Sequence, residues 1–116
     1  MFKHTLVYRE KPMYLWRMDQ VDIFKALSNK TRLLILEWLK DPASHFPEQE
    51  RDFNEAGVCV GEIQKKAKLT QSTVSEYLSI LQRTGLIEST RIGQWTYYKR
   101  NEAAFQLLKE QINKEL

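Results

Sequence analysis

The 116-residue sequence contains little of what builds covalent or metal-bound scaffolds: it has one Cys and two His. A single Cys cannot form a disulfide within the chain, and such sparse use is typical of a reducing compartment. No run of about 18 apolar residues is present, which excludes an apolar membrane-spanning segment. Residues 1–5 lack the apolar stretch of a signal peptide. We therefore expect a cytoplasmic protein with no membrane partner.

Motifs for catalysis are missing as well. The chain has no Gly-rich phosphate loop, no nucleophile motif and no paired acid and base, and His4 and His45 stand alone. We expect neither enzyme activity nor a cofactor. With 42% hydrophobic and 28% charged residues, the composition is that of an ordinary folded domain, and the length predicts a single one.

The chain has little net charge, but its positive charge is unevenly distributed along the sequence. The net charge is only +3, yet residues 61–100 carry seven Lys and Arg against three Glu, a net charge of +4. A basic segment of this kind is the pattern expected for contacts with nucleic-acid phosphates. A normal solvated surface would give the same count, so charge alone leaves both interpretations open.

The segment 70–85 predicts a helix with two unlike faces. Val74, Leu78 and Leu81 fall at i, i+4 and i+7 and share an apolar stripe. Thr70 is a favourable N-cap, and Gly85 marks the end of the helix. The opposite face carries Gln, Ser and Thr, where a purely solvated helix would carry Lys and Glu. Short, uncharged side chains that can hydrogen-bond base edges suit a helix that lies in a major groove.

A β-hairpin is predicted directly after this helix. Residues 86–92 form one predicted strand, Gly93 and Gln94 a tight turn, and residues 95–100 a second strand rich in aromatic and β-branched side chains. A recognition helix followed at once by a basic hairpin is the order of a winged helix-turn-helix, in which the hairpin is the wing.

The segments ALSNKTRLLILEWL and LTQSTVSEYLSILQRTGLIESTRIGQWTYYK, with the spacing between them, resemble the ArsR-type (ArsR/SmtB) bacterial transcription repressors over residues 19–112. The resemblance implies a mainly α fold with a β-hairpin, a winged helix-turn-helix of about five helices that dimerises through its first and last helices. It also implies a homodimeric repressor that binds a palindromic operator in double-stranded DNA. The sequence indicates no effector.

Periodicity divides the chain into an N-terminal extension or arm, residues 1–17, and a winged-helix domain, residues 18–116. Residues 41–57 form a predicted acidic loop with five carboxylates against one Arg, a net charge of −4. The matching connection in the ArsR-type pattern is short, so this loop is an insertion. Helices are predicted over residues 14–27, 30–40, 58–68, 70–84 and 102–116.

Candidate DNA contacts come from the recognition helix, the wing and nearby basic positions. Helix N-termini favour phosphates, whereas later positions of the helix reach bases. The alternative is that the Ser and Thr residues only cap and solvate the helix. The candidates are Thr70, Gln71, Ser72, Thr73, Ser75, Glu76, Arg91, Gly93, Gln94, Lys30, Arg32, Lys65, Lys66 and Lys68. Glu76 departs from the family pattern, in which a basic or amide residue is frequent, but it can accept a hydrogen bond from a cytosine amino group.

The aromatic residues of the hairpin, Trp95, Tyr97 and Tyr98, are expected to pack between the hairpin and the core rather than to stack on bases. On the last helix, apolar residues repeat at every fourth position and form a ridge. We predict a dimer interface from Leu15, Met18, Ala104, Leu108 and Ile112. Packing of the last helix on its own domain alone is the alternative.

Many ArsR-type repressors hold metals through a Cys-Val-Cys on the helix before the turn. In the segment GVCVGEI, Cys59 matches the first Cys and Gly61 stands where the second would be. The other common family site needs His on the last helix, which has none. We expect no metal site, because soft metals need the missing thiolate.

Two further readings of the function stay open. In one, the winged helix is a protein-interaction module that uses the acidic loop, with Phe46 and Phe53 as anchors. In the other, the protein is a repressor that responds to thiol oxidation through Cys59, although a buried, inert Cys is the simpler expectation.

Overall fold

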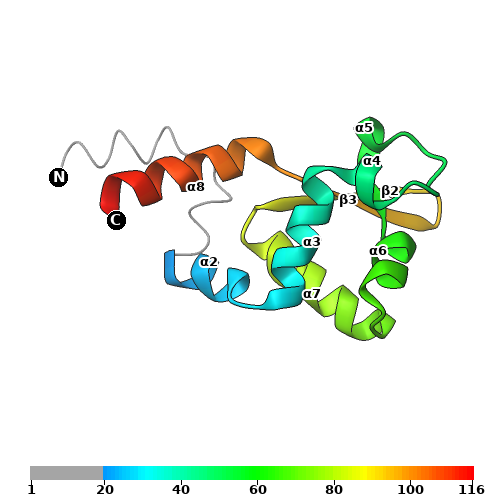
Figure 1. Ribbon diagram of the computed structural model, residues 1–116, viewed down its shortest axis with the longest axis horizontal. Helices are drawn as coiled ribbons and strands as arrows, with labels where there is room; N and C mark the ends of the chain where they lie inside the picture. Colours follow the sequence, from blue (N-terminus) through cyan, green and yellow to red (C-terminus); the bar gives the residue numbers. More distant parts are fainter. Residues whose placement is uncertain (1–19) are drawn as a thin grey trace.

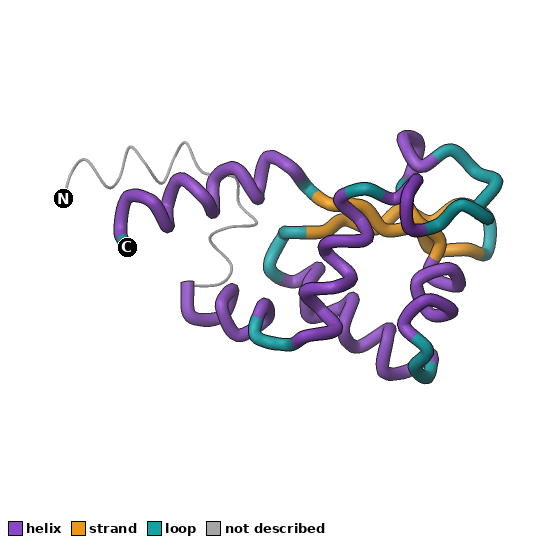
Figure 2. The backbone as a smooth tube through the Cα atoms, viewed as in Figure 1, coloured by secondary structure: helices purple, strands orange, loops and turns teal. Residues whose placement is uncertain are grey.

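The computed structural model describes residues 20–116, shown in Figures 1 and 2. The N-terminal arm, the boundary at residue 18 and the predicted interface residues Leu15 and Met18 lie outside the part it describes. The elements are α2 (Gln20–Leu27), α3 (Lys30–Lys40), α4 (Pro42–His45), α5 (Phe53–Ala56), β1 (Val58–Cys59), α6 (Val60–Ala67), α7 (Gln71–Arg83), β2 (Ile87–Ile92), β3 (Trp95–Arg100) and α8 (Glu102–Glu115).

The predicted hairpin is confirmed, with β2 and β3 as antiparallel neighbours. Ile92 lies opposite Trp95, so that Gly93 and Gln94 form the turn between the strands. Gly93 has a φ of 63°, in the left-handed region that glycine enters without a steric penalty. The turn chemistry that the sequence supplied therefore fixes the register of the whole wing.

A third strand, β1, extends the sheet to the order β1-β3-β2. Its two residues, Val58 and Cys59, pair with Tyr98 and Tyr97 of β3. Here the predicted helix over residues 58–68 is wrong at its start, because the first two residues pair with β3 before α6 begins at Val60.

The acidic segment predicted as a loop carries two short helices, so that residues 20–116 contain seven helices instead of about five. Local chemistry explains both. Pro42 occupies the first turn of α4, where its missing N–H costs nothing. Asp52 caps α5 by accepting a hydrogen bond from the Asn54 N–H at 2.9 Å.

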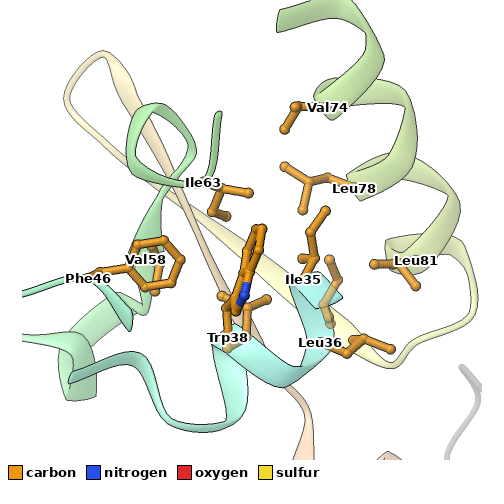
Figure 3. Close-up of a cluster of buried hydrophobic side chains, with 11 residues drawn as sticks. Ile35, Leu36, Trp38, Phe46, Val58, Ile63, Val74, Leu78 and Leu81 are labelled. Carbon is orange, nitrogen blue, oxygen red and sulfur yellow. The ribbon is translucent and has the colours of Figure 1, made fainter. Parts of the chain in front are cut away.

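The main core lies where α3, α6 and α7 pack against one face of the sheet (Figure 3). The predicted stripe of α7 is confirmed, since Val74, Leu78 and Leu81 are fully buried. Burial of such a stripe is the dominant favourable contribution to holding a surface helix in place. The core comprises Ile35, Leu36, Trp38, Leu39, Phe46, Val58, Ile63, Val74, Leu78, Leu81 and Ile87.

A second, smaller cluster joins α2 to α8, which runs away from the sheet in Figure 1. It consists of Ile23, Leu86, Ala104 and Leu108. α8 is capped by Asn101, whose side chain accepts a hydrogen bond from the Ala104 N–H at 3.1 Å. Between Gln20 and Leu116, no helix has the length and apolar character that crossing a bilayer requires.

Candidate DNA-binding surface

The recognition helix α7 presents the polar face that the sequence predicts. Its exposed positions are Gln71, Ser72, Ser75, Glu76, Ser79, Gln82 and Arg83. Because the opposite stripe is buried in the main core, this face is held at a fixed orientation to the rest of the domain. Thr73 and Tyr77 are half-buried at its border.

The N-terminus of α7 is capped by Thr70. Its Oγ1 accepts a hydrogen bond from the Thr73 N–H at 3.2 Å and lies 2.9 Å from Thr73 Oγ1. The N–H groups of Gln71 and Ser72 precede the first hydrogen bonds within the helix, as the first donors of any α-helix do. This end of α7 is therefore suited to a phosphate oxygen.

The turn between α6 and α7 depends on an unusual backbone position. Lys68 has a φ of 58° and caps α6 by donating its N–H to the Gln64 carbonyl at 3.0 Å. Among residues 20–116, no ion pair or ring contact involves the Lys68 ammonium group, which is exposed. Of the three Lys near this turn, Lys68 keeps the most freedom to reach an external phosphate.

The other basic candidates near α6 already have partners. Lys65 lies 3.5 Å from Glu62 and 3.8 Å from Glu48. The Lys66 ammonium group lies 5.4 Å from the centre of the Trp38 ring. Exposed ion pairs such as those of Lys65 are weak, so they do not prevent a phosphate contact, but Lys65 would exchange them for it.

The Arg32 side chain already forms hydrogen bonds within its own subunit. Its Nε donates to the Ala26 carbonyl at 2.6 Å, and its Nη2 donates to the Lys25 carbonyl at 3.2 Å. Both carbonyls belong to the last turn of α2, where free acceptors favour a cation. Lys30, in the first turn of α3, is exposed.

The wing lies next to the recognition helix and is joined to it by side chains. Gln82 Nε2 of α7 donates to Ser89 Oγ of β2 at 2.9 Å. At the tip, Arg91 Nε donates to the Gly93 carbonyl at 3.2 Å, and Gln94 is exposed. The structure thus joins the C-terminal half of α7 to β2 of the wing, through residues that are not themselves among the candidates.

The aromatic residues of the wing divide into two groups. Tyr97 is 7% exposed, and Tyr98 packs against the main core, as predicted. Burial raises the pKa of the Tyr98 phenol above its ordinary value. The prediction is wrong for Trp95, which is 51% exposed. Trp95 is the first residue of β3, and its side chain is on the face of the sheet opposite the one that Tyr98 turns to the main core.

Cys59 is half-buried and stands at the N-cap position of α6. It lines an open cavity of about 280 Å³ together with Gly61, Glu62, Lys65, Trp95 and Tyr97. Within residues 20–116, no three His, Cys, Asp or Glu side chains are grouped as a metal site would require.

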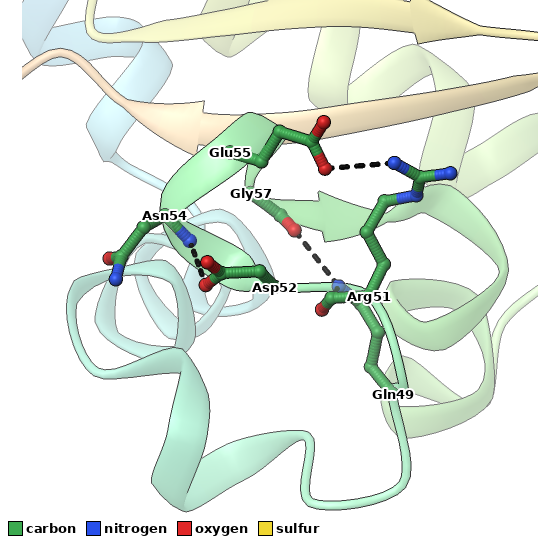
Figure 4. A network of polar contacts seen from close by, with 6 residues as sticks. All are labelled: Gln49, Arg51, Asp52, Asn54, Glu55 and Gly57. Carbon is green, nitrogen blue, oxygen red and sulfur yellow. Dashed lines mark hydrogen bonds and ion pairs between the residues drawn. The ribbon is translucent and has the colours of Figure 1, made fainter.

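The acidic segment is held against the sheet by residues that sequence reasoning missed (Figure 4). Gln49 Nε2 donates to the Gly57 carbonyl at 3.0 Å, and Gln49 Oε1 accepts from the Cys59 N–H at 2.9 Å. The amide side chain thereby occupies the outer hydrogen-bonding edge beside β1. No pattern in the sequence marks this Gln, because its partners are defined only by the folded edge.

Arg51 also connects the acidic segment to the sheet. Its Nη1 lies 2.8 Å from Glu55 Oε1, and its guanidinium lies 5.5 Å from the centre of the Tyr97 ring. The hydrogen bond to Glu55 is the main reason that the pKa of Arg51 is raised. Asp52 caps α5, and Asp41 accepts a hydrogen bond from Ser44 at 2.7 Å. Most carboxylates of the acidic segment therefore serve internal contacts.

The predicted dimer residues of α8 occupy different environments. Ala104 and Leu108 are buried inside the subunit against Ile23 of α2 and Leu86, which precedes β2, and Ile112 is half-buried beside them. Ala104 and Leu108 thus support α8 from within. Exposed apolar area in this part of the subunit includes Val21 of α2.

Comparison with known proteins agrees with this architecture. Residues 53–89 match the family described as "Bacterial regulatory protein, arsR family". The uncharacterized HTH-type transcriptional regulator YbzH of Bacillus subtilis (strain 168) is 52% identical over 100 residues, which cover 85% of this chain and 100% of YbzH. The chain belongs to the ArsR family. It is a DNA-binding transcription regulator.

More distant relatives extend the comparison. The transcriptional repressor SdpR of Bacillus subtilis (strain 168) is 28% identical over 85 residues, which cover 73% of this chain and 79% of SdpR. The solution NMR structure of the homodimeric winged helix-turn-helix DNA-binding domain Mb0332 from Mycobacterium bovis matches with a TM-score of 0.57. That match has 27% identity and covers 82% of this chain and 78% of Mb0332. The predicted winged helix-turn-helix fold is confirmed.

Proposed function

We propose that the protein is a homodimeric repressor that binds an imperfect palindrome, with α7 of each subunit in a major groove. Two-fold symmetric helix-turn-helix dimers place their recognition helices about one DNA turn, roughly 34 Å, apart. Repression follows if the occupied operator overlaps a promoter. Similarity to the repressor SdpR and to the homodimeric Mb0332 domain supports this mode.

The observation that carries the proposal is the exposed face of α7, on which Glu76 and Arg83 are the only charged residues and Gln and Ser predominate. Ser72, Ser75 and Ser79 are exposed along one helix whose other side is fully buried. Small hydroxyl side chains allow a close approach to base edges and can donate or accept there. A helix that only needed solubility would gain nothing from excluding Lys at these positions.

Roles within the surface follow from position. The N–H groups at Gln71 and Ser72 bind a phosphate at the helix N-terminus, with Thr70 holding that turn in shape. Ser75 and Glu76 face bases, and Glu76 accepts from a cytosine amino group. Arg91, Gly93 and Gln94 of the wing, and Lys68 of the turn, bind the flanking backbone.

Dimerisation is proposed through α2 and α8 together with the chain that precedes α2. A single subunit of this length has a modest core, and a partner would cover Val21, the large apolar side chain that α2 leaves exposed. Analytical ultracentrifugation tests this part directly. We expect a dimer at micromolar concentration, and a monomer would contradict it.

The packing of the acidic segment argues against the interaction-module hypothesis. Within residues 41–57, Glu48, Glu55 and Asp52 form contacts inside the subunit. Its anchor Phe46 is buried in the main core. This arrangement favours an acidic segment that stabilises the domain over one that recruits a partner.

The proposal is tested by selecting genomic fragments with purified protein and titrating the best duplex against salt. We expect one palindrome and an affinity that falls steeply as salt rises. Ser75→Glu should abolish that binding by placing a carboxylate against the DNA. Ala43→Glu, the same charge change on exposed α4, is the matched control and should bind like the wild type.

Random recovery of fragments, or equal binding of Ser75→Glu, contradicts sequence-specific recognition by α7. A reporter placed under the selected operator distinguishes the direction of regulation. Reduced expression in the presence of the protein supports repression, whereas increased expression contradicts it while leaving operator binding intact.

A further inference from the structure

Trp95 is the feature of the wing that the proposed contacts do not explain. It is 51% exposed and is the only aromatic side chain among the exposed large hydrophobics of residues 20–116. An indole offers about 150–250 Å² of surface for burial, so half-exposure leaves a large area in water. This exposed area lies on the wing, the part of the domain proposed to contact DNA beside the recognition helix.

Trp95 stands at the tip of the wing. It is the first residue of β3, follows the turn Gly93-Gln94, and lies opposite Ile92 in the hairpin. Antiparallel pairing fixes its backbone, and a Trp side chain has only two rotatable angles to restrain on binding. The ring is therefore presented by a rigid support at low entropic cost.

The surroundings of Trp95 combine apolar surface and charged side chains. The open cavity beside it, about 280 Å³, is bordered by Tyr97 and by Lys65 and Glu62, which form an ion pair at 3.5 Å. Arg91, exposed on β2, lies at the same end of the hairpin, but it pairs with Thr96 and its side chain is on the other face of the sheet. Lys99, two residues beyond Tyr97 on β3, is exposed on the Trp95 side of the sheet because side chains alternate along a strand.

We infer that Trp95 is a DNA-contacting residue, whose indole packs on the deoxyribose edge of the groove flanking the half-site. This inference rests on the proposed operator binding and adds an apolar contact to it. Deoxyribose offers an apolar ring face, and the indole N–H can donate to a phosphate oxygen. Apolar wing residues that reach a minor groove also favour readily deformed sequence steps. Trp95 thereby contributes to sequence preference outside the bases that α7 reads.

The test compares Trp95→Ala, Trp95→Phe and the wild type on the selected operator duplex. Stacking contacts of aromatic residues with nucleotides predict about a tenfold loss of affinity for Trp95→Ala, and a smaller loss for Trp95→Phe. Leu33→Ala is the matched control, because Leu33 is 50% exposed on α3, away from the wing. It should bind like the wild type.

Fluorescence provides a readout that lost stability would not imitate. In a Trp16→Phe background, emission comes from Trp38, which is buried, and from Trp95. The difference between this protein and its Trp95→Phe derivative reports Trp95 alone. We expect operator DNA to lower acrylamide quenching of that signal at least twofold, whereas a scrambled duplex at the same salt should have a smaller effect.

The outcomes separate the two proposals. If the wild type selects no operator, the proposed function fails and the Trp95 contact fails with it. If the wild type binds its operator while Trp95→Ala binds equally and acrylamide quenching is unchanged, only the Trp95 contact is refuted. If Trp95→Ala instead changes the sedimenting mass without DNA, Trp95 belongs to a protein–protein contact, and the inference is overturned.

Discussion

The guanidinium of Arg32 lies 5.3 Å from the centre of the Tyr77 ring and links the start of α3 to the middle of the recognition helix. The same side chain donates to the Ala26 carbonyl at 2.6 Å. One residue therefore fixes α7 relative to both α2 and α3. Arg32, which the sequence predicts as a phosphate contact, thus contacts α2 and α7 from its place in α3.

Arg32→Ala should lower the free energy of unfolding by about 1–3 kcal/mol, because it removes hydrogen bonds and a cation–π contact at once. Arg32→Lys should recover little of this, since an ammonium group cannot reproduce the planar guanidinium contacts. Urea denaturation measures the difference. Unchanged stability combined with weaker operator binding would instead favour the phosphate contact.

Gln49→Ala should destabilise the edge at β1. The substitution leaves the Gly57 carbonyl and the Cys59 N–H without the side-chain amide, and each lost hydrogen bond costs about 0.5–1.5 kcal/mol. Hydrogen exchange read by mass spectrometry should show faster exchange at residues 57–59. Gln106→Ala, at an exposed position of α8, is the control. If Gln106→Ala also accelerated exchange at residues 57–59, the effect of Gln49→Ala would not be local.

Gly57 and Gly61 should respond oppositely to replacement by Ala. Gly57 has a φ of 98°, and a Cβ there would collide with the Tyr98 carbonyl. Gly57→Ala should therefore separate β1 from β3 and cost more than about 2 kcal/mol. Gly61 lies within α6 with open space around it, so Gly61→Ala should be neutral or stabilise by about 0.5–1 kcal/mol. Thermal unfolding of both variants provides the comparison, and equal losses would contradict it.

Alkaline pH should weaken the fold partly through Tyr98. Its folded pKa is raised by burial, so the folded state keeps the proton at a pH where the unfolded chain has lost it. The contribution is complete below the unfolded pKa of about 10 and declines as pH rises through the folded pKa. Tyr98→Phe should show a shallower loss of stability above about pH 10. An identical slope would refute this assignment.

The sequence predicted the elements whose determinants are local. The stripe of Val74, Leu78 and Leu81, the cap at Thr70 and the turn at Gly93 each act within one element or one hairpin. Their positions in the structure therefore match those expected from periodicity and turn chemistry.

The features that were missed depend on contacts between distant segments. Cys59 becomes a strand residue only because Tyr97 of β3 presents it with a pairing edge. Gln49 and Arg51 gain their roles from that same edge. Trp95 was expected to pack because aromatic residues in strands usually do. Its exposure follows from its position at the start of β3, on the face of the sheet that is turned away from the main core.

The way Gln49 covers β1 also bears on how the protein behaves at high concentration. An uncovered sheet edge is a template on which a strand from another molecule can add, and such addition leads to aggregation. β1 has only two residues, and the amide of Gln49 already forms hydrogen bonds with the Gly57 carbonyl and the Cys59 N–H at this edge. Residues 41–57 thus shield the β1 edge of the sheet from intermolecular pairing, and a form lacking them would be the more aggregation-prone protein.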